Sequence, residues 1–201
     1  MEKIPQETLS DIHRIMERSS RFRSLNGFSF VAAGICGLLG AWWTSRSIAH
    51  RKLPLSAGET VSPNEIRVLV WIAGFTLSAA VISGLLFTLI KVKKRNLPLL
   101  DMTFRRVSAS FAIPMLAGGI FIAGVLFYHQ YQFIASACLL FYGIALINAS
   151  HYTVKEIYFL GIAEIITAII CLFAGYEILL LALGFGIMNM LFGLIIWNKY
   201  K

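Results

Sequence analysis

The chain has 201 residues, of which 58% are hydrophobic and 14% are charged, and it carries a formal net charge of +8. A soluble domain carries closer to about a quarter charged residues, so this composition excludes an ordinary soluble protein. The positive charge does not indicate nucleic-acid binding, because the Lys and Arg residues lie beside the ends of apolar runs and form no separate basic domain.

The first 24 residues form a polar segment in which apolar and charged side chains are interleaved. Leu9, Ile12 and Met16 share one helical face, which predicts an amphipathic helix from Thr8 to Phe22 lying on the membrane surface. A helix that docks a cytosolic partner is the alternative. Because a polar segment precedes the first apolar run, that run is expected to be a retained span and not a signal peptide.

Six apolar runs follow within residues 25–201. A run of about 20 apolar residues at 1.5 Å per residue crosses a hydrocarbon core of about 30 Å. The predicted spans are Leu25 to Thr44, Val68 to Ile90, Val107 to Tyr128, Tyr131 to Ser150, Ile157 to Gly175 and Ile178 to Trp197. The predicted fold class is therefore all-α, a polytopic membrane bundle of six transmembrane helices with a short N-terminal amphipathic helix.

The distribution of Lys and Arg predicts the orientation, because cations near span ends are retained on the cytoplasmic side. Fourteen of the 18 cations lie on the side that holds the N-terminus. They are Lys3, Arg14, Arg18, Arg21, Arg23, Lys91, Lys93, Lys94, Arg95, Arg105, Arg106, Lys155, Lys199 and Lys201. Both termini are therefore expected in the cytoplasm. The basic loop from Lys91 to Arg106 is either simply solvated or in contact with anionic lipid, at about 1 kcal/mol per cation near the surface.

Connections between the third and sixth spans are very short, which predicts that consecutive helices pack as antiparallel neighbours. Small residues also recur at four-residue spacing, a pattern that lets helix backbones approach closely in lipid. These pairs are Ala33 with Gly37, Gly74 with Ser78, Ala80 with Gly84, and Gly119 with Ala123. Helix packing within the bundle is the expected role of all four.

Glu164 is the only charged residue in the middle of any span. A carboxylate facing lipid at this depth costs several kcal/mol, so Glu164 is expected to face the bundle interior in its protonated form. Asn189 and Tyr142 lie at the same depth on the neighbouring spans, each roughly 17 to 18 Å from the outer end of its span at 1.5 Å per residue. Thr167 lies one turn from Glu164 on the same face. These four residues form the candidate ligand- or ion-binding site.

Two interpretations of this polar group remain open. In the structural one, protonated Glu164 donates a hydrogen bond to Asn189 or Tyr142 and fixes helix register, at about 0.6 kcal/mol on average for a membrane hydrogen bond. Replacement by Leu would then leave one of the two without a partner. In the functional one, Glu164 belongs to a proton- or cation-coupled path or to a ligand pocket.

Catalytic sites are excluded by missing motifs. The chain has no H-E-x-x-H and no G-x-S-x-G, and both aspartates, Asp11 and Asp101, lie outside the spans. The four histidines lie in loops or at span ends, which excludes a bis-His haem inside the bilayer. Cys36, Cys138 and Cys171 lie within spans, where they pack as small apolar residues. We therefore expect no enzyme, no cofactor and no metal site.

Several short motifs follow one another along the chain: Met16-Glu17-Arg18-Ser19, Phe111-Ala112-Ile113-Pro114, Phe141-Tyr142-Gly143, Leu160-Gly161 with Glu164, and Leu183-Gly184-Phe185-Gly186. In this order they resemble a family of small bacterial membrane proteins of unknown function with six spans. The resemblance implies a multi-pass protein of the bacterial inner membrane, and it implies no chemistry.

Two functional classes fit these observations. A regulatory or scaffold protein would use its N-terminal helix and basic loop to meet a cytosolic protein partner or anionic lipid, or would form a homo-oligomer. A small channel or transporter would use the polar site around Glu164. The sparse polar lining favours the first class slightly, because a transporter usually shows more mid-membrane polar groups or broken helices.

Overall fold

The computed structural model describes residues 27–51, 63–94 and 102–199, and these ranges contain helices and no strands. The first three spans are α2 (Gly27–Arg51), α3 (Pro63–Lys94) and α4 (Met102–Phe127). A short 3₁₀ turn, η1 (Tyr131–Phe133), leads into α5 (Ile134–Ser150), which is followed by α6 (Lys155–Ala174). The last span is divided into α7 (Glu177–Leu181), the π-helical η2 (Ala182–Met188) and α8 (Asn189–Lys199).

Six of the described helical segments are long and apolar enough to cross a membrane. They coincide with the six predicted spans, so the all-α six-span fold class is confirmed. The predicted amphipathic helix from Thr8 to Phe22 lies outside the described residues, as does the middle of the basic loop. The connection expected from Ser45 to Arg67 is shorter than predicted, because α2 continues to Arg51 and α3 begins at Pro63.

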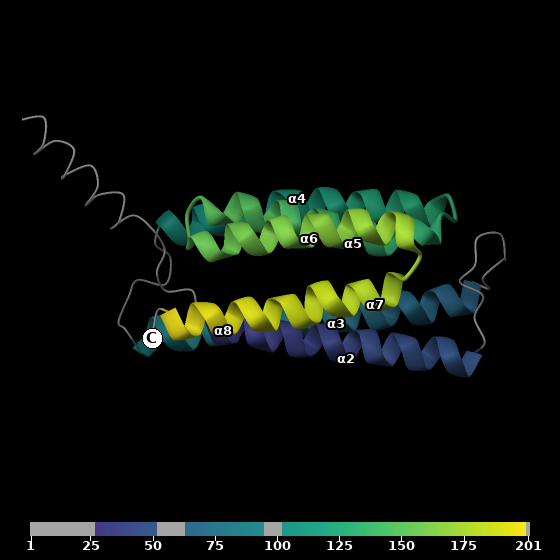
Figure 1. Cartoon of the computed structure of the whole chain (residues 1–201), viewed down its shortest axis with the longest axis horizontal. Coiled ribbons are helices and arrows are strands. Elements are labelled where there is room, and N and C mark those ends of the chain that lie inside the picture. Colours follow the sequence, from purple (N-terminus) through teal and green to yellow (C-terminus); the bar gives the residue numbers. More distant parts are fainter. Residues whose placement is uncertain (1–26, 52–62, 95–101, 200–201) are drawn as a thin grey trace, which may run out of the picture.

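The helices lie side by side in two layers (Figure 1). One layer holds α4, α5 and α6, with α5 packed against both of the others. The second layer holds α2, α3 and the last span, with α2 packed against both α3 and η2–α8. The layers meet where α6 and α5 face the last span.

Glycines set the closest approaches within each layer. A β-carbon added to Gly143 of α5 would lie 2.8 Å from the carbonyl oxygen of Gly161 on α6, and the reverse distance is also 2.8 Å. In the second layer, a β-carbon on Gly193 would lie 2.8 Å from the carbonyl oxygen of Gly27. These backbones approach so closely that neither crossing has room for a side chain.

Most of the small-residue pairs predicted from four-residue spacing do not lie at these close helix contacts. Gly37 does pack on η2, where an added β-carbon would meet the backbone of Phe185. A β-carbon on Gly74, Gly84 or Gly119 would meet nothing within 4 Å. Gly74 with Ser78 and Gly119 with Ala123 are exposed, so the prediction was wrong for these two pairs, because spacing alone does not tell which face of a helix meets a neighbour. For Ala80 with Gly84, which are partly buried, it stays a prediction.

Gly175 ends α6 with a left-handed φ of 69°, a conformation that costs glycine little. The chain then crosses directly into the other layer, so the last span packs mainly on α2. Sequence reasoning expected this tight connection to make spans five and six close neighbours. They do meet, but through a smaller contact than α6 makes with α5.

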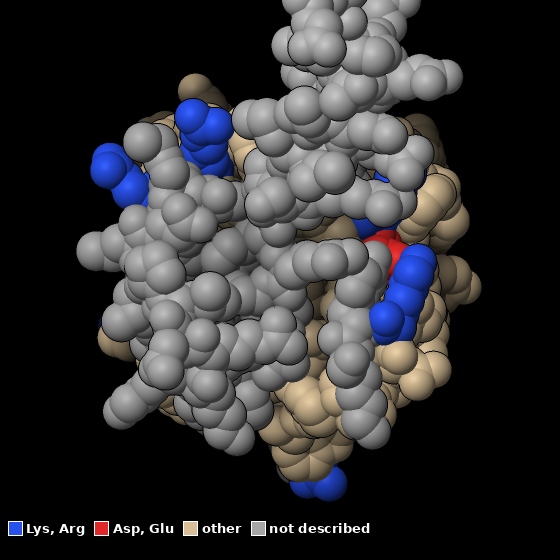
Figure 2. All heavy atoms as spheres, turned by 90° about the vertical axis from the view of Figure 1, so that its left-hand side faces the viewer, with Lys and Arg blue, Asp and Glu red and all other residues tan. Residues whose placement is uncertain are grey.

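Large apolar side chains cover the outside of the bundle; Ile113, Ile120 and Phe173 are 68%, 75% and 83% exposed. Such a surface suits a lipid environment. At one end, Lys199 of α8 forms an ion pair of 2.6 Å with the largely buried Glu156 of α6, which joins the two layers. Figure 2 views this end and shows acidic and basic side chains in contact, with further basic side chains at its margin.

Candidate functional site

Glu164 lies at the contact between the two layers and is completely buried, with an exposed fraction of 0%. Two apolar clusters lie on either side of it along α6. One contains Ile157 and Leu160 and extends to Ile196 of α8. The other contains Ala168 and Cys171 and extends to Leu139 of α5. The prediction that Glu164 faces the bundle interior is confirmed.

The carboxyl group of Glu164 rests against Gly184 in the π-helical segment. A β-carbon added to Gly184 would overlap the Oε2 atom of Glu164, so only glycine leaves room for the carboxyl group. Neither Oε1 nor Oε2 of Glu164 has a hydrogen-bond partner among the residues that the structure describes. The hydrogen bond from Glu164 to Asn189 or Tyr142 that the structural interpretation requires is therefore absent.

Asn189 and Tyr142 bond to each other instead. The Tyr142 hydroxyl donates to Oδ1 of Asn189 at 2.7 Å, and Nδ2 of Asn189 donates to the carbonyl oxygens of Gly184 and Phe185 at 3.3 and 3.4 Å. Asn189 is 1% exposed, so these bonds satisfy both ends of a fully buried amide. The two residues were predicted to lie together at one depth, and the structure joins them directly.

The π-helical segment positions this group. In a π-helix each backbone hydrogen bond spans five residues instead of four, and each carbonyl oxygen can still accept a second bond from a side chain. The Asn189 side chain supplies a donor to two of them, those of Gly184 and Phe185. The Phe185 ring lies 4.9 Å from the Tyr142 ring, centroid to centroid, which holds the tyrosine against η2. Segments of this kind occur frequently at functional sites.

Sequence reasoning placed the four polar residues but missed this element and the role of Gly184. The available signal was the pair of glycines, Gly184 and Gly186, in the middle of a span shortly before Asn189. Thr167 also behaves differently from the prediction. Its hydroxyl donates to the carbonyl of Ala163 at 2.8 Å and lies 3.7 Å from Sδ of Met188, so it does not bond to the other three residues.

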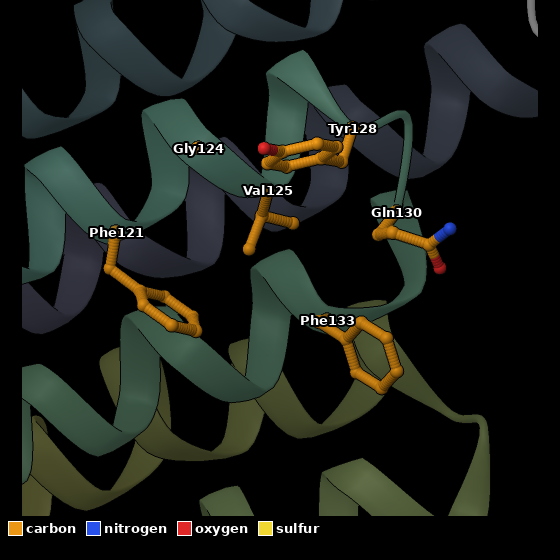
Figure 3. A pocket seen from close by; sticks show the side chains of 6 residues that line it. All are labelled: Phe121, Gly124, Val125, Tyr128, Gln130 and Phe133. Carbon is orange, nitrogen blue, oxygen red and sulfur yellow. The ribbon is translucent and has the colours of Figure 1, made fainter.

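Two hollows in the described part of the bundle lie away from Glu164. One, of about 400 Å³, lies where α4 turns into η1 and is lined mainly by apolar side chains, among them Phe121, Val125 and Phe133 (Figure 3). The other, of about 340 Å³, lies between α4 and the end of α5. The Glu164 side chain is instead fully buried at the contact between the layers, between the two apolar clusters. The described residues contain no group of three or more His, Cys, Asp or Glu side chains able to hold a metal ion.

Comparison of the chain with protein-family models, curated proteins and solved structures finds no match. The resemblance to small bacterial six-span membrane proteins stays a prediction.

Proposed function

We propose that this protein is a small transport protein of the membrane, a channel or transporter in which Glu164 carries a proton across the contact between the two layers. The observation that supports this most is the buried carboxyl group without a partner. An intramembrane carboxyl group is costly, and such residues commonly belong to proton or ion pathways. A purely structural role is less suitable, because Glu164 makes no hydrogen bond that would repay its burial.

The surroundings favour a proton over a metal cation. Ca²⁺ takes about six to eight oxygen ligands, and Mg²⁺ requires a nearly octahedral set. Around Glu164 the other polar oxygens already accept hydrogen bonds: Oδ1 of Asn189 from Tyr142, and the Gly184 and Phe185 carbonyls from Asn189. A proton on the carboxyl group needs no such set of ligands.

Access to Glu164 requires the layers to part, because apolar clusters close the contact on both sides. Separation at Ile157, Leu160 and Ile196 would admit water from the end that carries Lys199. Separation at Leu139 and Ala168 would admit water from the other end. Transporters often contain interrupted helices, which the sequence did not indicate here. The π-helical η2 is an interruption of the regular α-helix in the last span.

The test is proton flux into liposomes that contain the full-length protein and a pH-sensitive dye, driven by a potassium potential. The intact protein should carry protons faster than protein-free liposomes, and Glu164→Gln should reduce the flux to that background. Glu177→Gln is the matched control, since Glu177 lies at the end of its span and is partly exposed; this variant should retain the flux. Flux at background in the intact protein, or equal flux in Glu164→Gln, would contradict the proposal.

A regulatory or scaffold protein is the second candidate, and the closure of the contact around Glu164 by apolar clusters is the observation that favours it. A closed bundle suits a protein that only presents surfaces to a partner. The segments that would meet this partner, 1–24 and the middle of the loop from Lys91 to Arg106, lie outside the described residues. Background flux together with specific retention of a cytosolic protein by residues 1–24 would favour this candidate.

A further inference from the structure

The groove between α4 and the end of α5 has polar walls although it opens on the outside of the bundle. It has a volume of about 340 Å³ and is lined by Ser110, Ile113, Asn148, His151 and Tyr152. It lies at the end of the bundle where α4 begins and α5 ends, so its occupant would come from the headgroup region of one leaflet. No step of the proposed transport uses it.

The groove offers both hydrogen-bond donors and acceptors. The amide of Asn148 is exposed and bonds to none of the residues that the structure describes. Pro114 has no N–H group, so it donates nothing to the Ser110 carbonyl one turn earlier. Nδ1 of His151 lies 3.2 Å from the Ile147 carbonyl, and this contact does not engage the other ring nitrogen, Nε2.

Positive charge lies about one helical turn from the groove residues of α4. Arg106 precedes Ser110 by four residues and Ile113 by seven, so all three lie on one face of α4. Arg105 and Arg106 are both exposed, and neither forms an ion pair with the described part of the chain. Ile113 is 68% exposed and lies about 10 Å further along the helix axis at 1.5 Å per residue, at the depth where acyl chains begin.

We propose that this groove binds the headgroup of an anionic phospholipid of the phosphatidylglycerol class. Arg106 pairs with the phosphodiester, as arginine does with phosphate in general. The glycerol hydroxyl groups of the headgroup donate to the Ser110 carbonyl and bond to the Asn148 amide, while Ile113 contacts the first part of the acyl chain. A choline headgroup has no hydroxyl or N–H group to donate to these acceptors. An ethanolamine headgroup can donate, but its ammonium group neutralises the phosphodiester and would lie near Arg105 and Arg106.

The test is native mass spectrometry of the full-length protein released from nanodiscs that contain equal amounts of phosphatidylglycerol, phosphatidylethanolamine and phosphatidylcholine. The intact protein should retain phosphatidylglycerol several-fold more than the other two. Arg106→Gln should remove this preference. Asn148→Asp keeps the side-chain shape but adds a negative charge beside the phosphate, and it should remove the preference as well.

Lys155→Gln is the matched control, because Lys155 is exposed at the same end of the bundle but on α6. It should leave the preference unchanged. Equal retention of all three lipids by the intact protein would overturn the proposal. Unchanged preference in both groove variants would also overturn it, since the lipid would then bind elsewhere. Equal loss in Lys155→Gln would overturn it as well, since that result would assign the effect to overall charge. Thermal unfolding of each variant in the same detergent shows whether it is folded.

Discussion

At the scale of single residues, the unpartnered carboxyl group of Glu164 changes what its replacement should do. The sequence suggested that Leu at this position would leave Asn189 or Tyr142 without a partner. In the structure those two residues bond to each other, and the Glu164 carboxyl lies against Gly184 without a bond of its own. The burial of Glu164 is therefore a cost to stability that its neighbours do not offset.

We expect Glu164→Leu to leave the free energy of unfolding unchanged or to raise it by about 1–3 kcal/mol, the cost of a buried polar group without a partner. The same variant should lose proton flux, as expected when a functional residue opposes stability. Unfolding in a denaturing detergent measures the first quantity and the liposome assay the second. Tyr142→Phe is the control that does remove a bond, and it should destabilise by about 0.6 kcal/mol. Marked destabilisation by Leu would instead indicate a structural role for Glu164.

At the scale of elements, η2 brings the site together. The Asn189 side chain bonds to two carbonyl groups of this segment, and Gly184 leaves the space that the Glu164 carboxyl occupies. The π-helical turn and the buried carboxyl thus depend on each other. A change of η2 to a regular α-helix would turn Gly184 and Phe185 relative to Asn189 and so alter both of these contacts.

Gly184→Ala should lower the free energy of unfolding by about 1–3 kcal/mol, since the added methyl group overlaps the Glu164 carboxyl and approaches the Leu139 side chain. The cost should fall in a Glu164→Ala background, where the carboxyl is gone, and the two changes should be non-additive by at least about 0.5 kcal/mol. Gly119→Ala is the control, because its methyl group would meet nothing within 4 Å. If Gly184→Ala and Gly119→Ala changed the free energy of unfolding equally, the Glu164 carboxyl would not limit the space at residue 184.

At the scale of the whole molecule, the two layers are each held by glycine crossings, while the contact between them is apolar apart from the site and the ion pair of Glu156 with Lys199. Because close backbone contacts hold each layer together, each layer would move as a unit during the proposed transport. The orientation of the bundle across the membrane is predicted from the unequal distribution of Lys and Arg between its two ends.

Both termini and the loop from Lys91 to Arg106 are predicted to lie in the cytoplasm, because fourteen of the 18 cations lie on that side. Reporter fusions at Lys201 should be active only for cytoplasmic reporters. Ser56→Cys should react with a membrane-impermeant thiol reagent added from outside the cell. Labelling of Ser56→Cys only from the cytoplasmic side would reverse the orientation.

Much of the fold could be predicted from the sequence, because a bilayer imposes length and apolarity on each span separately. The boundaries of α5 and α6 were predicted within a few residues for this reason. The candidate site was predicted in part: depth along a helix is countable, so Glu164, Asn189 and Tyr142 were expected at one level. Which of them would bond could not be predicted, because hydrogen bonding depends on the rotation of each helix about its axis.

The sequence by itself determined the number of spans, the inward position of Glu164 and the orientation expected in the membrane. The first two follow from the cost of exposing polar or charged groups to lipid, and the third from the retention of Lys and Arg on the cytoplasmic side. Each of these effects acts on one residue or one span at a time. The tertiary structure alone decided that the last span leaves α6 for α2, that η2 is π-helical, and that Gly184 lies against Glu164. These features depend on how surfaces of different helices fit together, and that fit involves residues far apart in the chain.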